Sequence, residues 1–115
     1  MTDRLAEEAD VYVSVMTRFE VMRGMRDRER ESTFELLNSF EALDVTSDIA
    51  DRAGELIRSW RKRGVTLGDA DAIIAATALQ HGLVLVTTNA KHFSMPDLVI
   101  FQADEKGNLS LYKAA

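Results

Sequence analysis

The stretch VTLGDADAIIAATALQHGLVLVTTN, residues 65–89, decides the fold. Asp69 is suited to the start of a helix and Gly82 to its end, so the stretch predicts an Ala-rich helix between them. The small side chains of this helix would allow it to lie flat on a sheet. The run LVLV at 83–86 is short and apolar at every position, which is typical of a buried parallel strand. Together these features predict an α/β fold.

Two carboxylates stand at the start of this helix. Residues two apart on a helix point roughly 200° apart, so Asp69 and Asp71 should have different roles. We expect Asp69 to cap the helix and Asp71 to lie on its inner face, toward the carboxyl ends of the strands, where ligands bind in such folds. Asn89 falls at the same level. The plain alternatives are that Asp69 is only a cap and that Asp71 only stabilises the helix dipole.

The rest of the chain predicts strands that alternate with helices, which argues for one α/β domain over residues 1–115 with a mainly parallel sheet. Ser47 is the expected cap of the longest helix. The predicted elements are helical turns at 2–9, a strand at 11–15, helices at 18–29 and 33–42, an extended piece at 43–45, a helix at 48–63, a strand at 98–101 and an edge strand at 108–112.

Glu20 has two interpretations. Thr17 and Glu20 match the Ser/Thr-x-x-Glu capping box, in which the Glu side chain reaches back to the backbone of the capping residue. Glu20 also follows the carboxyl end of the strand at 11–15, which is the level expected for Asp71. This coincidence favours a functional acid over a capping residue.

Composition excludes several classes of protein. The chain has no cysteine, so disulfides and thiolate metal sites are ruled out. No apolar run reaches the roughly 18 residues of a membrane span, so we expect a cytoplasmic protein that does not enter the membrane. The net charge of −5 does not attract nucleic acid overall. The Arg-rich runs at 23–30 and 58–63 could face phosphates, although a solvated helix face is the commoner explanation.

The segments TRFEVMRG at 17–24, LGDADAIIAATALQHGLVLVTTNAKHF at 67–93 and DLVIF at 97–101 resemble the PIN-domain family. The resemblance is strongest to the VapC toxins of bacterial and archaeal toxin–antitoxin pairs, and it covers about residues 5–102. It implies a three-layer α/β fold with a small sheet flanked by helices. It also implies a metal-dependent endoribonuclease that cleaves RNA, a cognate antitoxin as partner, and a homodimer.

The resemblance further implies that carboxylates hold Mg²⁺ or Mn²⁺. Glu20 and Asp71 match the family's catalytic, metal-binding acids, and Asp69 would be an accessory ligand at best. Asn89 stands where many members have Asp and could ligate through its carbonyl oxygen. Oxygen ligands suit hard divalent ions, and a bound ion would generate a hydroxide and neutralise charge on the scissile phosphate. His92 stands where Asp or Glu is common, and an isolated His is more often a surface residue than a ligand.

The sequence departs from the family at its start. Family members begin with a strand that ends in Asp-Thr-Asn or Asp-Thr-Ser, and nothing in residues 1–115 matches this motif. We therefore expect the central strand and one principal metal ligand to be missing. The strands at 11–15 and 83–87 would then expose unpaired backbone groups. We expect these strands to pair directly, or a strand of a second copy to swap in, with residues 108–112 as one candidate.

Two further functions stay open. A PIN-fold remnant with an incomplete metal site would bind RNA or an antitoxin without cutting RNA. An unrelated small α/β protein would use its acids only as helix caps.

Overall fold

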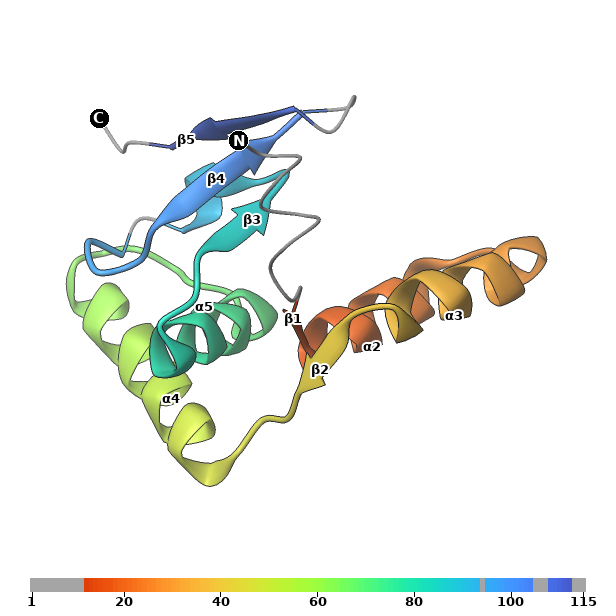
Figure 1. The fold of residues 1–115 in the computed structure, drawn as a ribbon. Helices are drawn as coiled ribbons and strands as arrows, with labels where there is room; N and C mark the ends of the chain where they lie inside the picture. Colours follow the sequence, from red (N-terminus) through yellow and green to blue (C-terminus); the bar gives the residue numbers. More distant parts are fainter. Residues whose placement is uncertain (1–11, 94, 105–107, 113–115) are drawn as a thin grey trace. The chain divides into compact units, whose positions relative to one another are not determined.

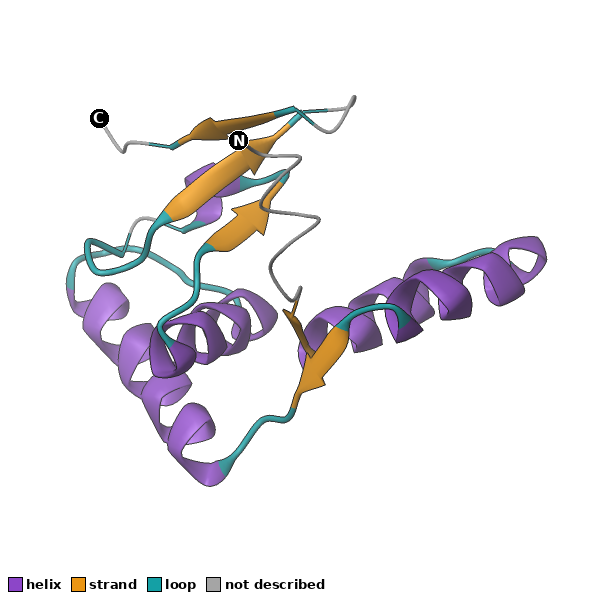
Figure 2. Cartoon of the chain, in the orientation of Figure 1, coloured by secondary structure: helices purple, strands orange, loops and turns teal. Residues whose placement is uncertain are grey.

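The computed structural model describes residues 12–93, 95–104 and 108–112 (Figure 1). Strands and helices alternate along the chain as predicted, and small sheets with parallel pairing are flanked by helices, so the protein is an α/β protein (Figure 2). The chain divides into two compact units, Met1–Val45 and Thr46–Ala115. Each unit is described by itself below. The helical turns predicted at 2–9 lie outside the described residues.

The first unit holds a two-stranded parallel sheet and two helices. Val13 of the first strand lies opposite Ala42 of the second. The strand predicted at 11–15 is confirmed, and the extended piece predicted at 43–45 is a strand that begins two residues earlier. The elements are β1 (Tyr12–Ser14), α2 (Val15–Gly24), the 3₁₀ helix η1 (Asp27–Glu29), α3 (Arg30–Asn38) and β2 (Glu41–Leu43).

The capping box predicted at Thr17 is wrong, because α2 begins earlier than the sequence pattern indicated. Ser14 is the N-cap, and its hydroxyl accepts a hydrogen bond from the Met16 N–H at 3.1 Å. Thr17 therefore lies within the first turn of the helix. The helix also ends early, at Gly24, because the backbone becomes extended at Met25. Gly is a weak helix former, so an end at this position is expected on propensity.

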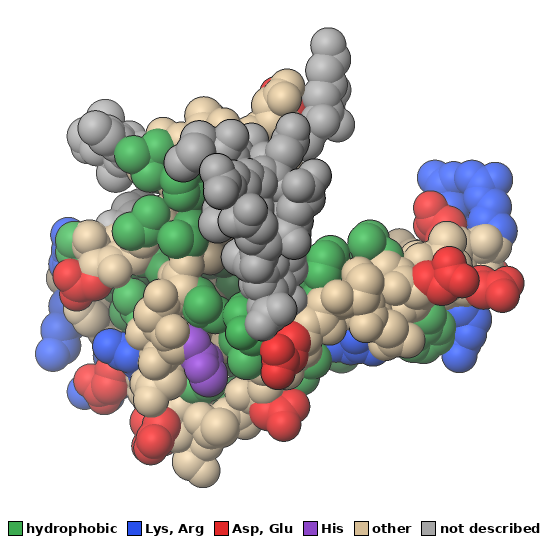
Figure 3. All heavy atoms as spheres, in the orientation of Figure 1, with side chains coloured by type: hydrophobic (Ala, Val, Ile, Leu, Met, Phe, Trp, Pro, Cys, Tyr) green, Lys and Arg blue, Asp and Glu red, His purple; other side chains and the backbone are tan. Residues whose placement is uncertain are grey.

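The arginine run at 23–30 has the character of a solvated helix face. Arg26, Arg28 and Arg30 are exposed and alternate with acidic residues along η1 and the start of α3. Figure 3 shows basic and acidic side chains next to each other at this end of the helix pair. The Arg30 guanidinium also lies over the Phe34 ring, 5.2 Å from its centroid. A mixed-charge surface of this kind does not form a dedicated phosphate-binding patch.

The second unit holds two long helices and a three-stranded sheet. Its central strand runs parallel to the strand on one side and antiparallel to the strand on the other, in the order β3–β4–β5. The helices predicted at 48–63 and after Gly68 are confirmed, as are the strands near 83–86, 98–101 and 108–112. The elements are α4 (Ser47–Lys62), α5 (Asp69–His81), β3 (Leu85–Thr87), the 3₁₀ helix η2 (Ala90–His92), β4 (Ile100–Ala103) and β5 (Leu109–Leu111).

The core of the second unit is built on the packing of α4 against α5. Ala72, Ala75 and Ala76 of α5 are fully buried, and Ile49 of α4 is fully buried as well. The small side chains of α5, which we expected to meet a sheet, instead have α4 as their main partner. Trp60 of α4 also belongs to this core and is 8% exposed. The Arg63 guanidinium lies 5.3 Å from the centroid of its ring.

Both helices of this unit have well-defined ends. Thr46, rather than the predicted Ser47, caps α4, because its hydroxyl accepts a hydrogen bond from the Ile49 N–H at 3.3 Å. Gly82 ends α5 as predicted, with a left-handed φ of 64° that favours glycine. Within the described part of the chain, no helix is both long and apolar enough to span a bilayer.

Two expectations about the sheet require correction. The apolar run at 83–86 is not buried on both faces, because Val84 and Val86 are about half exposed. The tail strand β5 pairs with β4 on the edge away from β3, so it does not fill a gap beside β3. Direct pairing of β1 with β3 would join the two units and stays a prediction, as does strand exchange between two copies.

Candidate metal centre

The start of α5 carries two acids, and neither is a cap. Gly68 is the N-cap residue and provides no side-chain hydrogen bond, while Asp69 and Asp71 both lie in the first turn. The expectation that Asp69 caps the helix is therefore wrong. Both carboxylates lie near the positive end of the helix dipole, where negative charge is stabilised. The Asp69 side chain is exposed, and Asp71 is half-buried.

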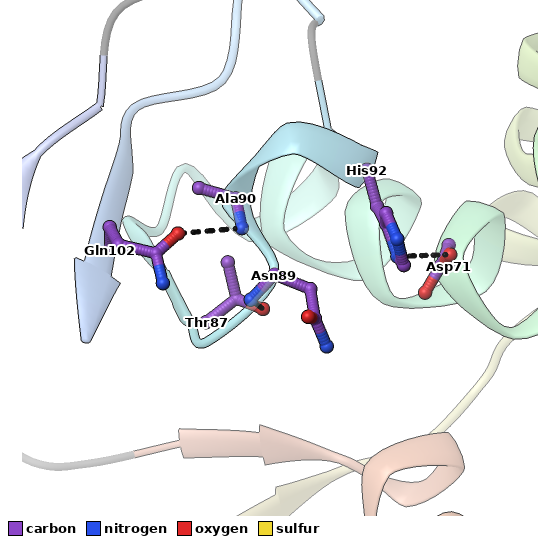
Figure 4. Close-up of polar contacts among 6 residues, drawn as sticks. All are labelled: Asp71, Thr87, Asn89, Ala90, His92 and Gln102. Atoms are coloured by element: carbon purple, nitrogen blue, oxygen red, sulfur yellow. Dashed lines mark hydrogen bonds and ion pairs between the residues drawn. The ribbon is translucent and has the colours of Figure 1, made fainter. Parts of the chain in front are cut away.

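Asp71 faces the loop that follows β3. Its Oδ2 lies 3.5 Å from Nδ1 of His92, the last residue of η2 (Figure 4). The side chains remain accessible, with 31% of Asp71 and 49% of His92 exposed. The distance exceeds the 2.7–3.2 Å usual for an N–H···O hydrogen bond, so the two side chains face each other without a well-formed hydrogen bond. The fold thus brings the helix start and the strand end together, as expected for Asp71.

The loop that carries Asn89 is held by hydrogen bonds on both sides. The Asn89 N–H donates to Thr87 Oγ1 at 3.0 Å. The carboxamide of Gln102, on the neighbouring strand β4, accepts from the Ala90 N–H at 2.9 Å and donates to the Thr88 carbonyl at 2.6 Å. Figure 4 shows the Asn89 side chain pointing out of this loop, away from Gln102. The Asn89 amide is exposed and has no hydrogen-bond partner among the described residues.

Glu20 belongs to the first unit and lies in the middle of α2. It is half-buried, and its carboxylate makes no hydrogen bond or ion pair within the described parts of the chain. Because α2 begins at Val15, the capping role that competed with a functional role for Glu20 does not apply. None of the described residues therefore competes with a ligand for this carboxylate through a hydrogen bond or ion pair.

Sequence reasoning did not find two residues of this region. Gln102 is one polar residue in an apolar strand, and no local pattern distinguishes it. For His92, the sequence pattern predicts an isolated surface residue rather than a partner of Asp71. A signal for its position was present, because His92 follows Asn89 by three residues in the loop after a strand, and that loop was already expected to lie near Asp71.

The donors in the second unit fit a hard divalent ion. Mg²⁺ commonly uses one or two carboxylates together with water; Asp71 offers an accessible carboxylate, and the Asn89 amide offers an exposed carbonyl oxygen on the loop after β3. Over residues 12–93, 95–104 and 108–112, no three His, Asp or Glu side chains form a group that could hold a metal. The second unit by itself therefore offers a partial donor set.

These features define an α/β protein in which polar side chains gather where a parallel strand ends. The PIN domain model matches residues 2–97, across both units, and the chain belongs to the PIN-domain family. Ribonuclease VapC10 of Mycobacterium tuberculosis (strain ATCC 25618 / H37Rv) is 38% identical over 89 residues, which cover 77% of this chain and 67% of the relative. Ribonuclease VapC1 of Methanocaldococcus jannaschii is 32% identical over 91 residues, with shares of 78% and 67%.

Solved structures give the same fold. VapBC from Salmonella typhimurium, determined bound to DNA, has a TM-score of 0.76 at 24% identity and covers 86% of this chain and 80% of its own, a similarity of fold alone. A toxin–antitoxin complex from Klebsiella pneumoniae has a TM-score of 0.63 at 35% identity, with shares of 75% and 69%. The PIN-like fold predicted from the sequence is confirmed.

Proposed function

We propose that this protein is a metal-dependent endoribonuclease and the toxin of a toxin–antitoxin pair, with RNA as substrate and a cognate antitoxin as protein partner. One observation carries the proposal: an accessible Asp71 carboxylate at the start of α5 faces His92 in the segment that follows β3, in a chain 38% identical to Ribonuclease VapC10. Solved toxin–antitoxin complexes with the same fold support the antitoxin partner. Such an activity belongs in the cytoplasm, where cellular RNA is found.

The proposed metal ligands are the carboxylates of Glu20 and Asp71, with the Asn89 carbonyl and Asp69 as accessory donors. Oxygen donors of this kind suit Mg²⁺ or Mn²⁺. When bound, a divalent ion supplies a hydroxide at neutral pH and neutralises charge on the phosphate. Asp71 would fix the ion at the start of α5, and the Asn89 amide would orient a water or a phosphate oxygen by donating a hydrogen bond.

A second function is a PIN-fold remnant that binds RNA or an antitoxin without cutting. It is favoured by the incomplete donor set among the described residues. The two functions differ in whether purified protein, free of its antitoxin, cleaves RNA when Mn²⁺ is added and stops when the ion is chelated.

The deciding variant is Asp71→Asn, which keeps the shape of the side chain and removes its charge. We expect it to reduce metal-dependent RNA cleavage by at least about a hundredfold, since it weakens a primary ligand, and to leave the unfolding temperature nearly unchanged. Asp51→Asn, on the exposed face of α4, is the matched control and should cleave like the wild type. If Asp71 only stabilises the helix dipole, the variant will lose under about 1 kcal/mol of stability and keep full activity.

A further inference from the structure

We infer that the metal centre includes a nitrogen ligand, Nδ1 of His92, and that it therefore prefers a transition ion such as Mn²⁺ or Co²⁺ to Mg²⁺. The inference rests on the metal site of the proposed function and specifies its chemistry. It assigns a role to a side chain that sequence reasoning had placed on the surface.

The first argument is the separation of His92 and Asp71. Their facing atoms, Nδ1 and Oδ2, are 3.5 Å apart, which is longer than a well-formed hydrogen bond. Two ligands that each lie about 2.1 Å from one ion are about 3.0 Å apart at the 90° angle of an octahedral site and about 3.4 Å apart at a tetrahedral angle. The observed 3.5 Å lies within about 0.5 Å of these separations, and both side chains are accessible enough for the ion to enter.

The second argument is the geometry of η2. Asn89 is its N-cap and His92 its last residue, so one short turn joins them. The His92 N–H donates to the Asn89 carbonyl at 2.9 Å, which closes this turn. Buried neighbours fix the turn, since Ala90 is fully buried and Phe93 is 3% exposed. The Asn89 amide and the His92 ring leave η2 on the same side, as Figure 4 shows.

The third argument is ligand chemistry. Mg²⁺ strongly prefers oxygen donors and is bound poorly by imidazole. Imidazole suits the first-row transition ions, and affinity rises from Mn²⁺ through Co²⁺ along the series. A donor set with Asp71 oxygen, Asn89 oxygen and His92 nitrogen therefore discriminates against Mg²⁺, whereas a set of oxygen donors alone would not.

The test is pulsed electron paramagnetic resonance of Mn²⁺ bound to the full chain, purified without a histidine tag. The sequence has two histidines, so His81→Gln, at the exposed end of α5, is a matched control for His92→Gln. We expect the modulation of directly bound ¹⁴N in the wild type and in His81→Gln, and its loss in His92→Gln. We also expect His92→Gln to weaken Mn²⁺ binding at least about tenfold while Mg²⁺ binding changes little.

A second variant separates ligand chemistry from a general disturbance of the loop. His92→Asp replaces the nitrogen donor with oxygen and should still bind a divalent ion, without ¹⁴N modulation and with a shift in preference toward Mg²⁺. If Mn²⁺ binds the wild type without nitrogen coupling, or if coupling persists in His92→Gln, the inference is wrong while the proposed nuclease stands. If wild-type protein binds no Mn²⁺ at all, both are overturned.

Discussion

Gln102, on strand β4, holds the backbone of the Asn89 loop in place through hydrogen bonds. Its carboxamide accepts a hydrogen bond from one side of Asn89 and donates one to the other side, which fixes the backbone of the loop relative to β4. Among the described residues, its hydrogen bonds go to backbone atoms and not to a proposed ligand atom, so it acts as a positioning residue. Its effect on a bound ion would pass through the backbone of residues 88–90.

Gln102→Leu should therefore weaken both stability and ion binding. The variant leaves the Ala90 N–H and the Thr88 carbonyl without their partners, which costs about 1–3 kcal/mol where a polar group is buried. Chemical denaturation and Mn²⁺ titration would measure the two effects. Gln80→Leu, which removes an exposed hydrogen bond from Arg52, is the control and should change neither quantity appreciably. Unchanged Mn²⁺ affinity in Gln102→Leu would show that the loop position does not depend on this side chain.

Single residues were predictable from sequence where their chemistry conflicts with packing. Asp71 stands out because a carboxylate is unexpected on the inner face of an Ala-rich helix, and Asn89 because it closely follows a predicted strand. Gln102 and His92 were not predictable in this way, since their roles arise from contacts across more than ten residues of chain. For Glu20, the sequence could not decide between capping and function, because the choice depended on which residue begins α2.

Among the elements, the helix ends are set by single side chains. Thr46 caps α4 through a hydrogen bond, whereas Ser47 is the first residue inside the helix. Thr46→Ala should destabilise the protein by about 1 kcal/mol, and Ser47→Ala should change its stability by only a few tenths in either direction, because an exposed first-turn Ser has little effect on a helix. Thermal denaturation of the pair measures the difference. Equal losses in the two variants would contradict this assignment of the cap.

The turn after α5 requires a left-handed backbone conformation. Gly82 has φ of 64°, and its N–H closes the helix end by donating to the Ala78 and Leu79 carbonyls. An added Cβ would meet no other atom within 4 Å, so the cost of Gly82→Ala comes from conformation alone. We expect a loss of about 1–2 kcal/mol in a denaturant titration. Gly54→Ala, in the exposed interior of α4 with similar space, should instead stabilise by up to about 1 kcal/mol.

The type and order of the elements were more predictable than their limits. Long periodic runs gave α4 and α5 nearly complete, because many residues contribute to each pattern. Ends moved by one to five residues where a single Ser, Thr or Gly decides them, as at α2. The predicted burial of β3 is too high. An apolar run shows that a strand could be buried, but it does not show which of the strand's two faces is covered by another element.

At the scale of the whole molecule, the family match runs through both units, and each unit carries one of the two acids proposed as metal ligands. A shared ion would then stabilise the native protein by mass action, by about 2.7 kcal/mol at one hundred times its Kd. We expect Mn²⁺ to raise the unfolding temperature of the wild type, and both Glu20→Gln and Asp71→Asn to abolish most of that rise. Glu35→Gln, on the exposed part of α3, should keep the rise. A full rise in Glu20→Gln would exclude Glu20 as a ligand.

Trp60 is the only tryptophan of the chain, and it is buried in the second unit. Intrinsic fluorescence at this ring therefore reports on one half of the protein, whereas far-ultraviolet circular dichroism averages over the helices of both halves. Trp60 can thus serve as an intrinsic fluorescence probe of the second unit. Superimposable melting curves from the two signals would indicate a single cooperative domain, and separated curves would identify which half loses its structure first.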